Sequence, residues 1–357
     1  MAKRPSRKAK TPFAALKQNM GKVLLGVIAI GSFAIAFGGG KVKNLLPTQT
    51  SNSQCLTQFY QNIPPILSKA SLQKNSYALC FNGFNVMYSG VSKTPLWSAE
   101  HLTPQRLSVK IKREDSFHEE TRIPEQYRAV LADYRGSGYD RGHMSPNADM
   151  SNKVSQADSF SLANMVPQAP KNNQQIWREL EEATRAMVTK QKQDVYVITG
   201  PTFEGSRLKT IGRGVIVPTA VYKAVYYPKQ GVTSVYYAPN NNTKQVKIIS
   251  ICELEDKVGI NIFPQLTEQQ KRNVYQLPKT AQQVRAKSKL SYSHWDGESQ
   301  CAEAPSRDMI QSQQQQFASK QLSAASNSSL NVDDDTKKAI VSQLLQVVVQ
   351  YFLQRST

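Results

Sequence analysis

The stretch from Asp133 to Met150, DYRGSGYDRGHMSPNADM, constrains the chain most, because a glycine-containing turn directly precedes the tetrapeptide DRGH. The turn holds Gly136 and Gly138, and the tetrapeptide ends at His143, one of only four histidines in the chain. Glycine adopts backbone conformations that other residues avoid, so a tight turn is expected here. A histidine beside such a turn is a candidate for proton transfer, since its usual pKa lies near neutrality.

Charged residues surround His143. A neighbouring carboxylate such as Asp140 can fix the tautomer of the imidazole, while Arg135 and Arg141 carry planar guanidinium groups suited to phosphate oxygens. A solvated surface turn is the alternative, because a tetrapeptide match alone is weak. A hydrolytic triad of Asp140, His143 and Ser145 is disfavoured, because three residues of one turn do not readily line up as acid, base and nucleophile.

A second motif occupies residues 164–184, NMVPQAPKNNQQIWRELEEAT. Pro170 cannot lie inside a helix and Asn173 is a good N-cap, so a helix is expected to begin near Asn173. Asn173, Trp177 and Glu181 are spaced by four, which places them on one helical face within about 80° of arc. An amide oxygen is a ligand that Mg²⁺ accepts, and Mg²⁺ often keeps several waters. The alternative is that Asn173 only caps the helix and Trp177 only fills the core.

Together the two motifs resemble the DNA/RNA non-specific endonucleases, the family of mitochondrial endonuclease G and of secreted bacterial nucleases. The resemblance covers roughly residues 80–278 and includes the shorter matches ADYRGSGY, N-x-x-P-Q, VITGP and VPTAVYK. It implies an α+β fold, with a mixed central β-sheet, flanking helices and a ββα-metal finger that forms the active site.

The resemblance also implies catalytic roles. His143 is expected to act as the general base on the attacking water, with Asp140 and Arg141 beside it in the site. An arginine followed by an aromatic upstream of DRGH is similar to the family's phosphate-stabilising arginine. Arg113 matches that position, and Arg122 and Arg128 remain its rivals because the spacing is loose.

The metal site is implied in the same way. Mg²⁺, with Mn²⁺ as an alternative, is expected to be held directly by Asn173 and otherwise by water. Glu181 is expected to contribute through a water molecule, and Asn164 to support the metal region.

Net charge points to an anionic partner. The chain has 45 Lys and Arg against 26 Asp and Glu, a net charge of +19. A basic surface attracts polyphosphates, which suits DNA and RNA as substrates. Two other functions stay open: a catalytically inactive nucleic-acid-binding protein of the envelope, and a phosphodiesterase acting on another diester.

The N-terminal segment predicts export. Residues 1–22 form a basic cytoplasmic segment, and residues 23–40 are an apolar run that suits either a transmembrane anchor or a signal peptide. Both interpretations send the remainder across the membrane, to a periplasmic or extracellular location, with anchoring in the inner membrane by residues 23–40 as one possibility. Residues 41–54 are expected to be a linker.

Four cysteines follow in the predicted nuclease domain or at its end. An even number in an exported protein suggests two disulfides, and Cys55–Cys80 with Cys252–Cys301 is the simplest of three possible connectivities. The nuclease domain itself is expected over residues 55–300. A β-strand is expected at Leu107–Ile111, and further strands between residues 194 and 251.

Residues 301–357 change in composition. They predict a Gln/Ser-rich linker followed by a C-terminal helix near residues 337–354. Apolar residues cover much of the circumference of that helix, so it should not stand alone in water. Docking on the domain, self-association and membrane contact all remain open.

The export interpretation can be tested with reporters fused near Ser51. Because the basic residues precede the apolar run, a reporter that is active only after export should be active, and a cytoplasmic reporter should be silent. The opposite pattern would refute export. Retention of the fusion in membranes after a high-salt wash would favour an anchor over a cleaved signal.

Overall fold

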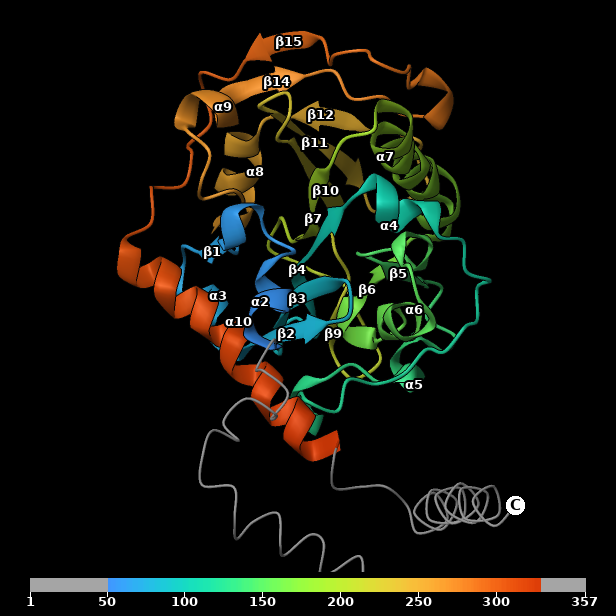
Figure 1. The fold of residues 1–357 in the computed structure, drawn as a ribbon. Coiled ribbons are helices and arrows are strands. Elements are labelled where there is room, and N and C mark those ends of the chain that lie inside the picture. Colours follow the sequence, from blue (N-terminus) through green and yellow to red (C-terminus); the bar gives the residue numbers. More distant parts are fainter. Residues whose placement is uncertain (1–50, 329–357) are drawn as a thin grey trace, which may run out of the picture. The chain divides into compact units, whose positions relative to one another are not determined.

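The computed structural model describes residues 51–328 and centres on a seven-stranded sheet with strand order β12-β11-β10-β7-β4-β3-β2 (Figure 1). Every pairing in this sheet is antiparallel. The α+β class is confirmed, but the sheet is antiparallel rather than mixed, because direct chain reversals join β2 to β4 and β10 to β12. Its strands are β2 (Ser76–Phe81), β3 (Phe84–Ser89), β4 (Thr94–Leu102), β7 (Val195–Thr202), β10 (Ala220–Tyr227), β11 (Val232–Pro239) and β12 (Lys247–Ile249).

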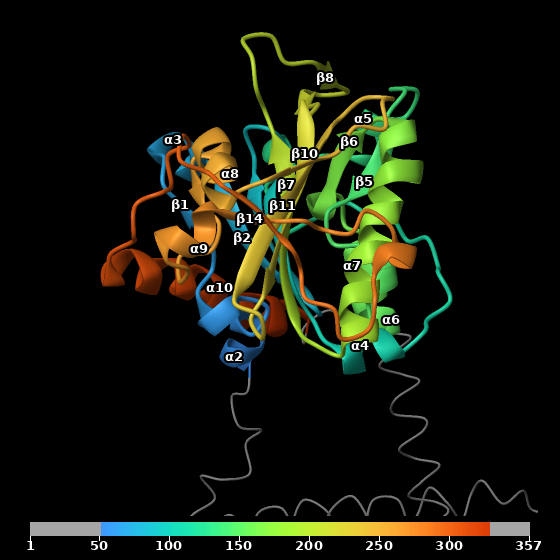
Figure 2. The ribbon, with the colours of Figure 1, turned by 90° about the horizontal axis from the view of Figure 1, so that it is seen from above.

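Helices cover both faces of the sheet (Figure 2). The first face carries α2 (Ser51–Leu56), α3 (Ala70–Gln73), α8 (Ile251–Val258), α9 (Glu268–Arg272) and α10 (Arg307–Ser328). The second face carries α4 (Pro104–Ser108), α6 (Lys153–Ser159) and α7 (Arg178–Gln191), with α5 (Leu131–Tyr134) above them in this view. The fold is therefore a three-layer arrangement with the sheet in the middle.

Short paired strands complete the fold. The pairs are β1 (Ile66–Leu67) with β13 (Ile260–Asn261), β5 (Asp140–His143) with β6 (Met165–Gln168), β8 (Thr210–Ile211) with β9 (Val215–Ile216), and β14 (Asn273–Tyr275) with β15 (Tyr292–Trp295). Single helical turns are η2 (Tyr60–Asn62), η3 (Glu125–Tyr127), η4 (Asn147–Asp149), η5 (Leu162–Asn164), η6 (Asn172–Trp177) and η7 (Ala281–Gln283). The order β5, β6, η6, α7 gives the two strands and a helix that the ββα finger predicts.

Each face of the sheet has its own hydrophobic core. On the first face, the rings of Phe59, Trp97 and Phe317 contact one another with centroid separations of 5.2–5.7 Å. On the second face, Trp177 and Leu180 pack against strands β7, β10 and β11. All eight residues of β10 are buried, which explains why its sequence is apolar or aromatic at every position except Lys223.

Two predicted elements are wrong. Residues 107–111 were expected to form a strand, but Leu107 lies in helix α4. The cause is local: the Thr103 side chain accepts a hydrogen bond from the Arg106 backbone N–H, and Pro104 fits the first helical position. The Gln/Ser-rich part of residues 301–357 is helix α10 as far as Ser328 rather than a linker.

Helix α10 is anchored because Phe317 is fully buried beside α2. The expected linker at 41–54 ends in helix, since α2 begins at Ser51. The basic segment 1–22, the apolar run 23–40 and the helix expected at 337–354 lie outside the described residues. Within residues 51–328, no helix combines the length and the apolar character needed to cross a membrane.

Both predicted disulfides are present. Cys55–Cys80 joins α2 to β2, and Cys252–Cys301 joins α8 to the segment before α10. Each bridge therefore holds a terminal segment of the described chain against the first face of the sheet.

Replacement of Phe317 tests whether α10 belongs to the folded domain. Phe317→Ala removes a fully buried ring and is expected to lower the free energy of unfolding in urea by about 3–5 kcal/mol. Met309→Ala on the same helix is the control, because Met309 is 42% exposed and its loss should cost less than about 0.5 kcal/mol. Equal stability of the two variants would contradict the packing.

Candidate active site

The paired strands β5 and β6 position His143, which lies opposite Met165. The turn after His143 is held by Asn164. Its side chain accepts a hydrogen bond from the Ser145 N–H at 3.0 Å and donates to the carbonyls of Ser145 and Ser159 at 2.8 and 2.9 Å. Asn164 is completely buried and its amide is fully used, so it supports the site through the backbone and not as a ligand.

Gly142 is required by the close packing of the two strands. A Cβ atom at this position would overlap the side chain of Gln168, which belongs to the paired strand β6. This contact, rather than backbone flexibility, explains the glycine of the DRGH tetrapeptide.

Asp140 contacts the helix and not the histidine. Its Oδ2 atom accepts hydrogen bonds from Asn173 Nδ2 at 2.9 Å and from Gln174 Nε2 at 2.8 Å. Side chains three positions apart on a strand point to opposite faces, which separates Asp140 from His143. Asp140 therefore does not fix the imidazole tautomer as the sequence suggested. It orients the Asn173 amide through its bond to Nδ2. Within residues 51–328, Asn173 Oδ1 accepts no hydrogen bond.

Two arginines extend over aromatic rings next to His143. The Arg141 guanidinium lies 3.9 Å from the Phe117 ring centroid, and the Arg113 guanidinium lies 5.4 Å from that of Phe160. Both rings also pack against the imidazole, at 5.9 and 5.1 Å. The aromatic pair thus holds the histidine and both cations in one cluster.

An open cavity of about 640 Å³ adjoins this cluster. Its wall includes Arg113, Arg141, Asp140 and Asn173, together with Asp115, Phe117, Leu131, Tyr134, Arg135, Tyr139 and Gln174. Neither His143 nor Glu181 is part of that wall. The rival arginines lie elsewhere: Arg122 pairs with Glu120 at 2.8 Å, and Arg128 pairs with Glu119 at 3.5 Å.

The surroundings of His143 keep its ring neutral. Burial, followed by the positive charges of Arg113 and Arg141, lowers the pKa of His143 to about 3, while Asp115 acts in the opposite direction. The Nε2 atom is enclosed and has no hydrogen-bond partner among the described residues. The other ring nitrogen, Nδ1, is then the atom available to an incoming water molecule.

Asn173 lies in a π-helical turn, η6, and not in the regular helix that the spacing predicts. Hydrogen bonds of two asparagine side chains hold this turn in place. Asn172 Oδ1 accepts a hydrogen bond from Gln168 Nε2 at 2.6 Å, and its Nδ2 donates to the Pro239 carbonyl at 2.9 Å. Asn240 Oδ1 accepts a hydrogen bond from the Ala169 N–H, and its Nδ2 donates to the carbonyls of Pro167 and Pro218. Such turns are often found at functional sites.

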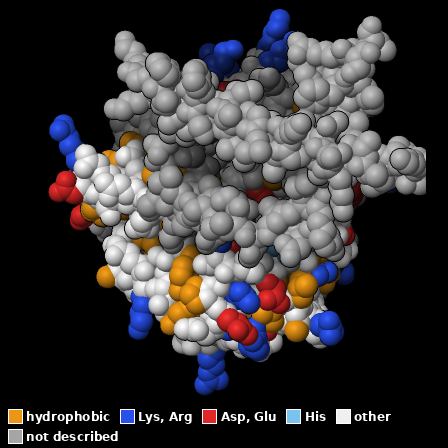
Figure 3. All heavy atoms as spheres, turned by 60° about the horizontal axis from the view of Figure 1, so that its bottom comes forward, with side chains coloured by type: hydrophobic (Ala, Val, Ile, Leu, Met, Phe, Trp, Pro, Cys, Tyr) orange, Lys and Arg blue, Asp and Glu red, His pale blue; other side chains and the backbone are white. Residues whose placement is uncertain are grey.

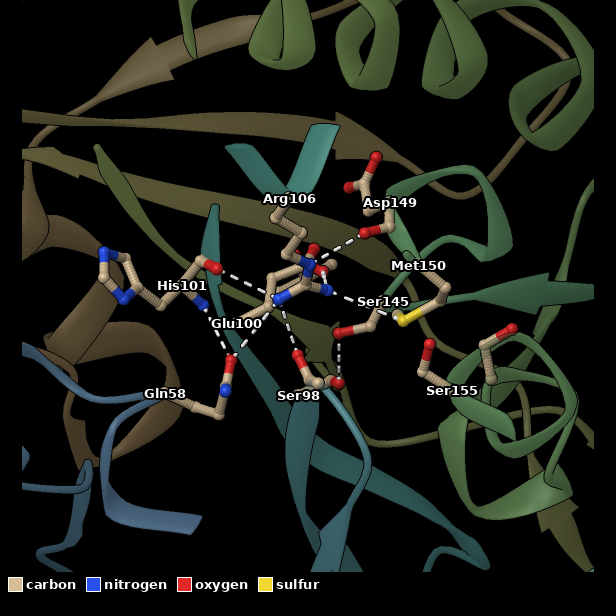
Figure 4. A network of polar contacts seen from close by, with 12 residues as sticks. Gln58, Ser98, Glu100, His101, Arg106, Ser145, Asp149, Met150 and Ser155 are labelled. Carbon is tan, nitrogen blue, oxygen red and sulfur yellow. Dashed lines mark hydrogen bonds and ion pairs between the residues drawn. The ribbon is translucent and has the colours of Figure 1, made fainter. Parts of the chain in front are cut away.

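Glu181 belongs to a buried set of three acids and three bases between the sheet and α7. Arg106 pairs with Glu100 at 3.2 Å and donates to the Asp149 carbonyl at 2.7 Å (Figure 4), while Arg185 pairs with Asp149 at 2.9 Å. Burial raises the pKa of Glu181 to about 7, against the opposing charges of Lys223 and Arg185. Each of these ion pairs places a carboxylate next to a guanidinium group.

Lys223 is the least expected member. It is 1% exposed, donates to Thr199 Oγ1 at 2.9 Å and lies 5.5 Å from the centroid of the Trp177 ring. Burial raises the pKa of Glu100 to about 8, against the opposing charges of Arg106 and Lys223.

Sequence reasoning missed Asp149, Arg185 and Lys223. Arg185 sits four residues after Glu181, a spacing that favours an ion pair on a helix and could have identified it. Lys223 interrupts an apolar strand, VYKAVYY, and a charge inside a buried run also signals a partner.

The donor set fits a hydrated divalent cation. Asn173 presents a neutral oxygen, and no hydrogen bond within residues 51–328 occupies the Glu181 carboxylate. In the described part of the chain, no three His, Cys, Asp or Glu side chains are grouped to hold a metal. A cation here would therefore depend on few protein ligands and on water, as Mg²⁺ does.

Comparison with known proteins identifies relatives. A family model described as "DNA/RNA non-specific endonuclease" matches residues 64–269. The chain is 35% identical over 205 residues to mitochondrial nuclease EXOG of Danio rerio, covering 51% of this chain and 60% of the relative. It is 36% identical over 170 residues to mitochondrial endonuclease G of Homo sapiens, covering 44% and 54%.

A fungal relative is covered more fully. Nuclease C1 of Cunninghamella echinulata var. echinulata is 32% identical over 237 residues, which is 60% of this chain and 90% of that protein. By contrast, the chain covers little more than half the length of the mitochondrial relatives EXOG and endonuclease G. The crystal structure of the EndoG/EndoGI complex contains a similar fold, with a TM-score of 0.53 and 23% identity over 64% of this chain and 97% of that chain.

The lowered pKa of His143 predicts how stability changes with pH. The folded-state pKa of about 3 lies below the ordinary 6.5, so on acidification the unfolded chain binds this proton first. The stability present above about pH 6.5 is then lost progressively down to about pH 3. When the pH falls from about 7 to about 5, the free energy of unfolding in urea should decrease by about 1–2 kcal/mol less in His143→Gln than in the parent. Parallel losses in both proteins would show that the ring is not held neutral.

Proposed function

The chain belongs to the DNA/RNA non-specific endonuclease family, and on that premise we propose that it hydrolyses phosphodiester bonds of DNA and RNA with His143 as general base. The observation that carries the proposal is the cluster around the cavity. Two guanidinium groups and an oriented amide line the cavity from β5, the 113–117 segment and η6, and a neutral imidazole packs beside them against Phe117 and Phe160. Hydrolysis of a phosphodiester needs a base, anion-binding groups and a Lewis acid.

His143 takes the proton of the attacking water. A ring with a pKa of about 3 is unprotonated at neutral pH, and a bound phosphate offsets the positive charges of Arg113 and Arg141 that lower its basicity. The proton gained on the imidazole is balanced by the negative charge that develops on phosphorus-bound oxygens next to it. The flanking rings of Phe117 and Phe160 hold the imidazole in place during this step.

Arg113 and Arg141 stabilise the phosphate. Their guanidinium groups line the cavity and carry permanent charge, which favours the transition state as negative charge accumulates on the phosphate oxygens. Arg122 and Arg128 lie outside this cavity, whereas Arg113 lies in its wall, paired with Asp115 at 2.5 Å, which supports Arg113 over its rivals.

Asn173 holds the cofactor, proposed to be Mg²⁺. Asp140 binds the amide nitrogen and turns the oxygen outward, and Glu181 contributes through water. When bound, the ion neutralises charge on the leaving 3′ oxygen, and the products carry 5′ phosphates. Asn164 supports this region by holding the turn that follows His143.

Substrate breadth follows from the kind of contacts available. The proposed groups all address phosphate, and none is assigned to a base edge or a 2′ hydroxyl. Export is part of the proposal, because two disulfides are typical of oxidising compartments and a non-specific nuclease is kept apart from the cell's own nucleic acid.

Replacement of His143 and Asn173 tests the proposal. His143→Ala should reduce cleavage of plasmid DNA and of RNA by on the order of 10²-fold or more, because acid/base catalysis contributes about 10²–10⁴. His118→Ala, which removes an exposed histidine, is the matched control and should cleave at the parental rate. Inactivity of the parent toward both polymers, with activity toward a small diester, would point to the phosphodiesterase alternative.

A metal titration separates the two roles. Asn173→Ala should need a higher Mg²⁺ concentration for half-maximal activity, whereas the residual activity of His143→Ala should keep the parental Mg²⁺ dependence. A parental Mg²⁺ dependence in Asn173→Ala would exclude Asn173 as a ligand. Circular dichroism of each variant controls for unfolding.

A further inference from the structure

A basic strap runs along the β12 edge of the sheet. The strap is residues 273–295, which contain β14, η7 and β15, and it crosses the top of Figure 1 from β14 to the end of α7. It contains Lys279, Arg285, Lys287 and Lys289 and no Asp or Glu. All four basic side chains are exposed.

The strap is fixed to the domain by its backbone. Lys190 Nζ, near the end of α7, donates to the Ala281 carbonyl at 2.7 Å, and Tyr236 Oη donates to the Pro278 carbonyl at 2.6 Å. The Leu290 N–H donates to Gln230 Oε1 at 3.2 Å. One basic side chain of the strap also anchors it: Lys279 Nζ donates to the Val246 carbonyl at 3.2 Å, whereas within residues 51–328 the side chains of Arg285, Lys287 and Lys289 make no hydrogen bond.

The positive charges of the strap lack acidic partners. No ion pair within residues 51–328 involves Lys279, Arg285, Lys287 or Lys289, nor the neighbouring exposed Lys192 and Lys229. On a different face, Figure 3 shows Lys and Arg side chains lying among Asp and Glu side chains. Unpaired like charges on one segment repel one another, so the strap suits an anionic partner.

Exposed aromatic side chains follow the basic residues directly. Tyr292 is 54% exposed and Trp295 is 48% exposed, and both lie on β15. Strands without base pairs bind to proteins through such a combination, in which cations follow the phosphates and aromatic rings stack on the bases.

The strap and the candidate active site lie at opposite ends of one helical segment. Asn173 is in η6, and Lys190 contacts the strap 17 positions later. That separation corresponds to about 25 Å at the rise of a helix. Along the axis of a nucleic-acid helix, roughly seven or eight nucleotides of one strand extend over about 25 Å.

We propose that the strap is a second nucleic-acid-binding surface, which holds single-stranded DNA or RNA several nucleotides away from the bond that is cut. The inference rests on the proposed nuclease function for its substrate class. Its contacts are to phosphates and to base faces, so it holds strands without regard to sequence.

An anionic lipid surface is the competing partner. Amphipathic membrane-binding helices insert several apolar side chains, such as Leu, Phe and Trp, beside their basic residues. In the strap the aliphatic residues Val274, Leu277 and Val284 are buried in the domain instead. This arrangement favours a nucleic acid over a lipid.

The test compares two triple variants of equal charge. The strap variant is Arg285→Gln, Lys287→Gln and Lys289→Gln. The control is Lys69→Gln, Lys74→Gln and Arg307→Gln, exposed positions next to α3 and at the start of α10 on the first face of the sheet. Binding to single strands of about 30 and about 6 nucleotides is measured in chelator over a range of salt, so that no cleavage is needed.

The strap variant should bind the long strand more weakly and with a log–log salt slope smaller by up to about 2, since each phosphate contact on a single strand contributes about 0.7. Its affinity for the short strand should fall less, because a strand of about 6 nucleotides contacts one surface at a time and can still bind at the active site. Trp295→Ala should lower the affinity for long single strands by on the order of 5-fold and the affinity for duplexes by less.

Two outcomes would overturn the proposal. One is a strap variant whose affinity and salt slope match those of the control. The other is unchanged binding to nucleic acid together with lost binding to vesicles of anionic lipid, which would assign the strap to a membrane. Failure of the parent to cleave any polymer would instead reject the nuclease function, since strand binding is measured without cleavage.

Discussion

Burial of the charged set between the sheet and α7 constrains the rest of the structure. Glu100 of β4, Lys223 of β10 and Arg185 of α7 come from distant parts of the sequence, and each charge is costly to bury without its partners. Removing one member of such a pair typically costs about 3–5 kcal/mol. Strands β4 and β10, helix α7 and the loop after β5 must therefore reach their final positions together.

This requirement positions the candidate site. With α7 fixed against the sheet, η6 brings Asn173 to Asp140 on β5, and the same strand carries Arg141 and His143. The aromatic rings of Phe117 and Phe160 then enclose the imidazole. The neutral histidine and the outward amide oxygen are thus products of packing, and neither is a property of the DRGH or N-x-x-x-W-x-x-x-E motifs alone.

The sequence predicted the elements whose signals are local or covalent. Cys55–Cys80 with Cys252–Cys301 was the simplest of the three pairings that the sequence allowed, and β10 was predicted from an apolar and aromatic run that only Lys223 interrupts. Helix α4 was missed because the weak strand pattern of residues 107–111 hid a Thr-Pro helix start. Helix α10 was missed because glutamine and serine resemble a linker, whereas the burial of Phe317 and Gln313 shows its contact with the domain.

By itself the sequence determined which residue types are available for chemistry: the histidine, the arginines, the amide and the carboxylate at recognisable spacing, together with the α+β class. Tertiary structure decided how they are used. It turned Asp140 away from His143 toward Asn173, selected Arg113 over Arg122 and Arg128 for the cavity, and placed Lys223 next to Trp177. These outcomes depend on strand facing, burial and long-range charge pairing, which act between segments that are far apart in the chain and leave no short-range pattern to read.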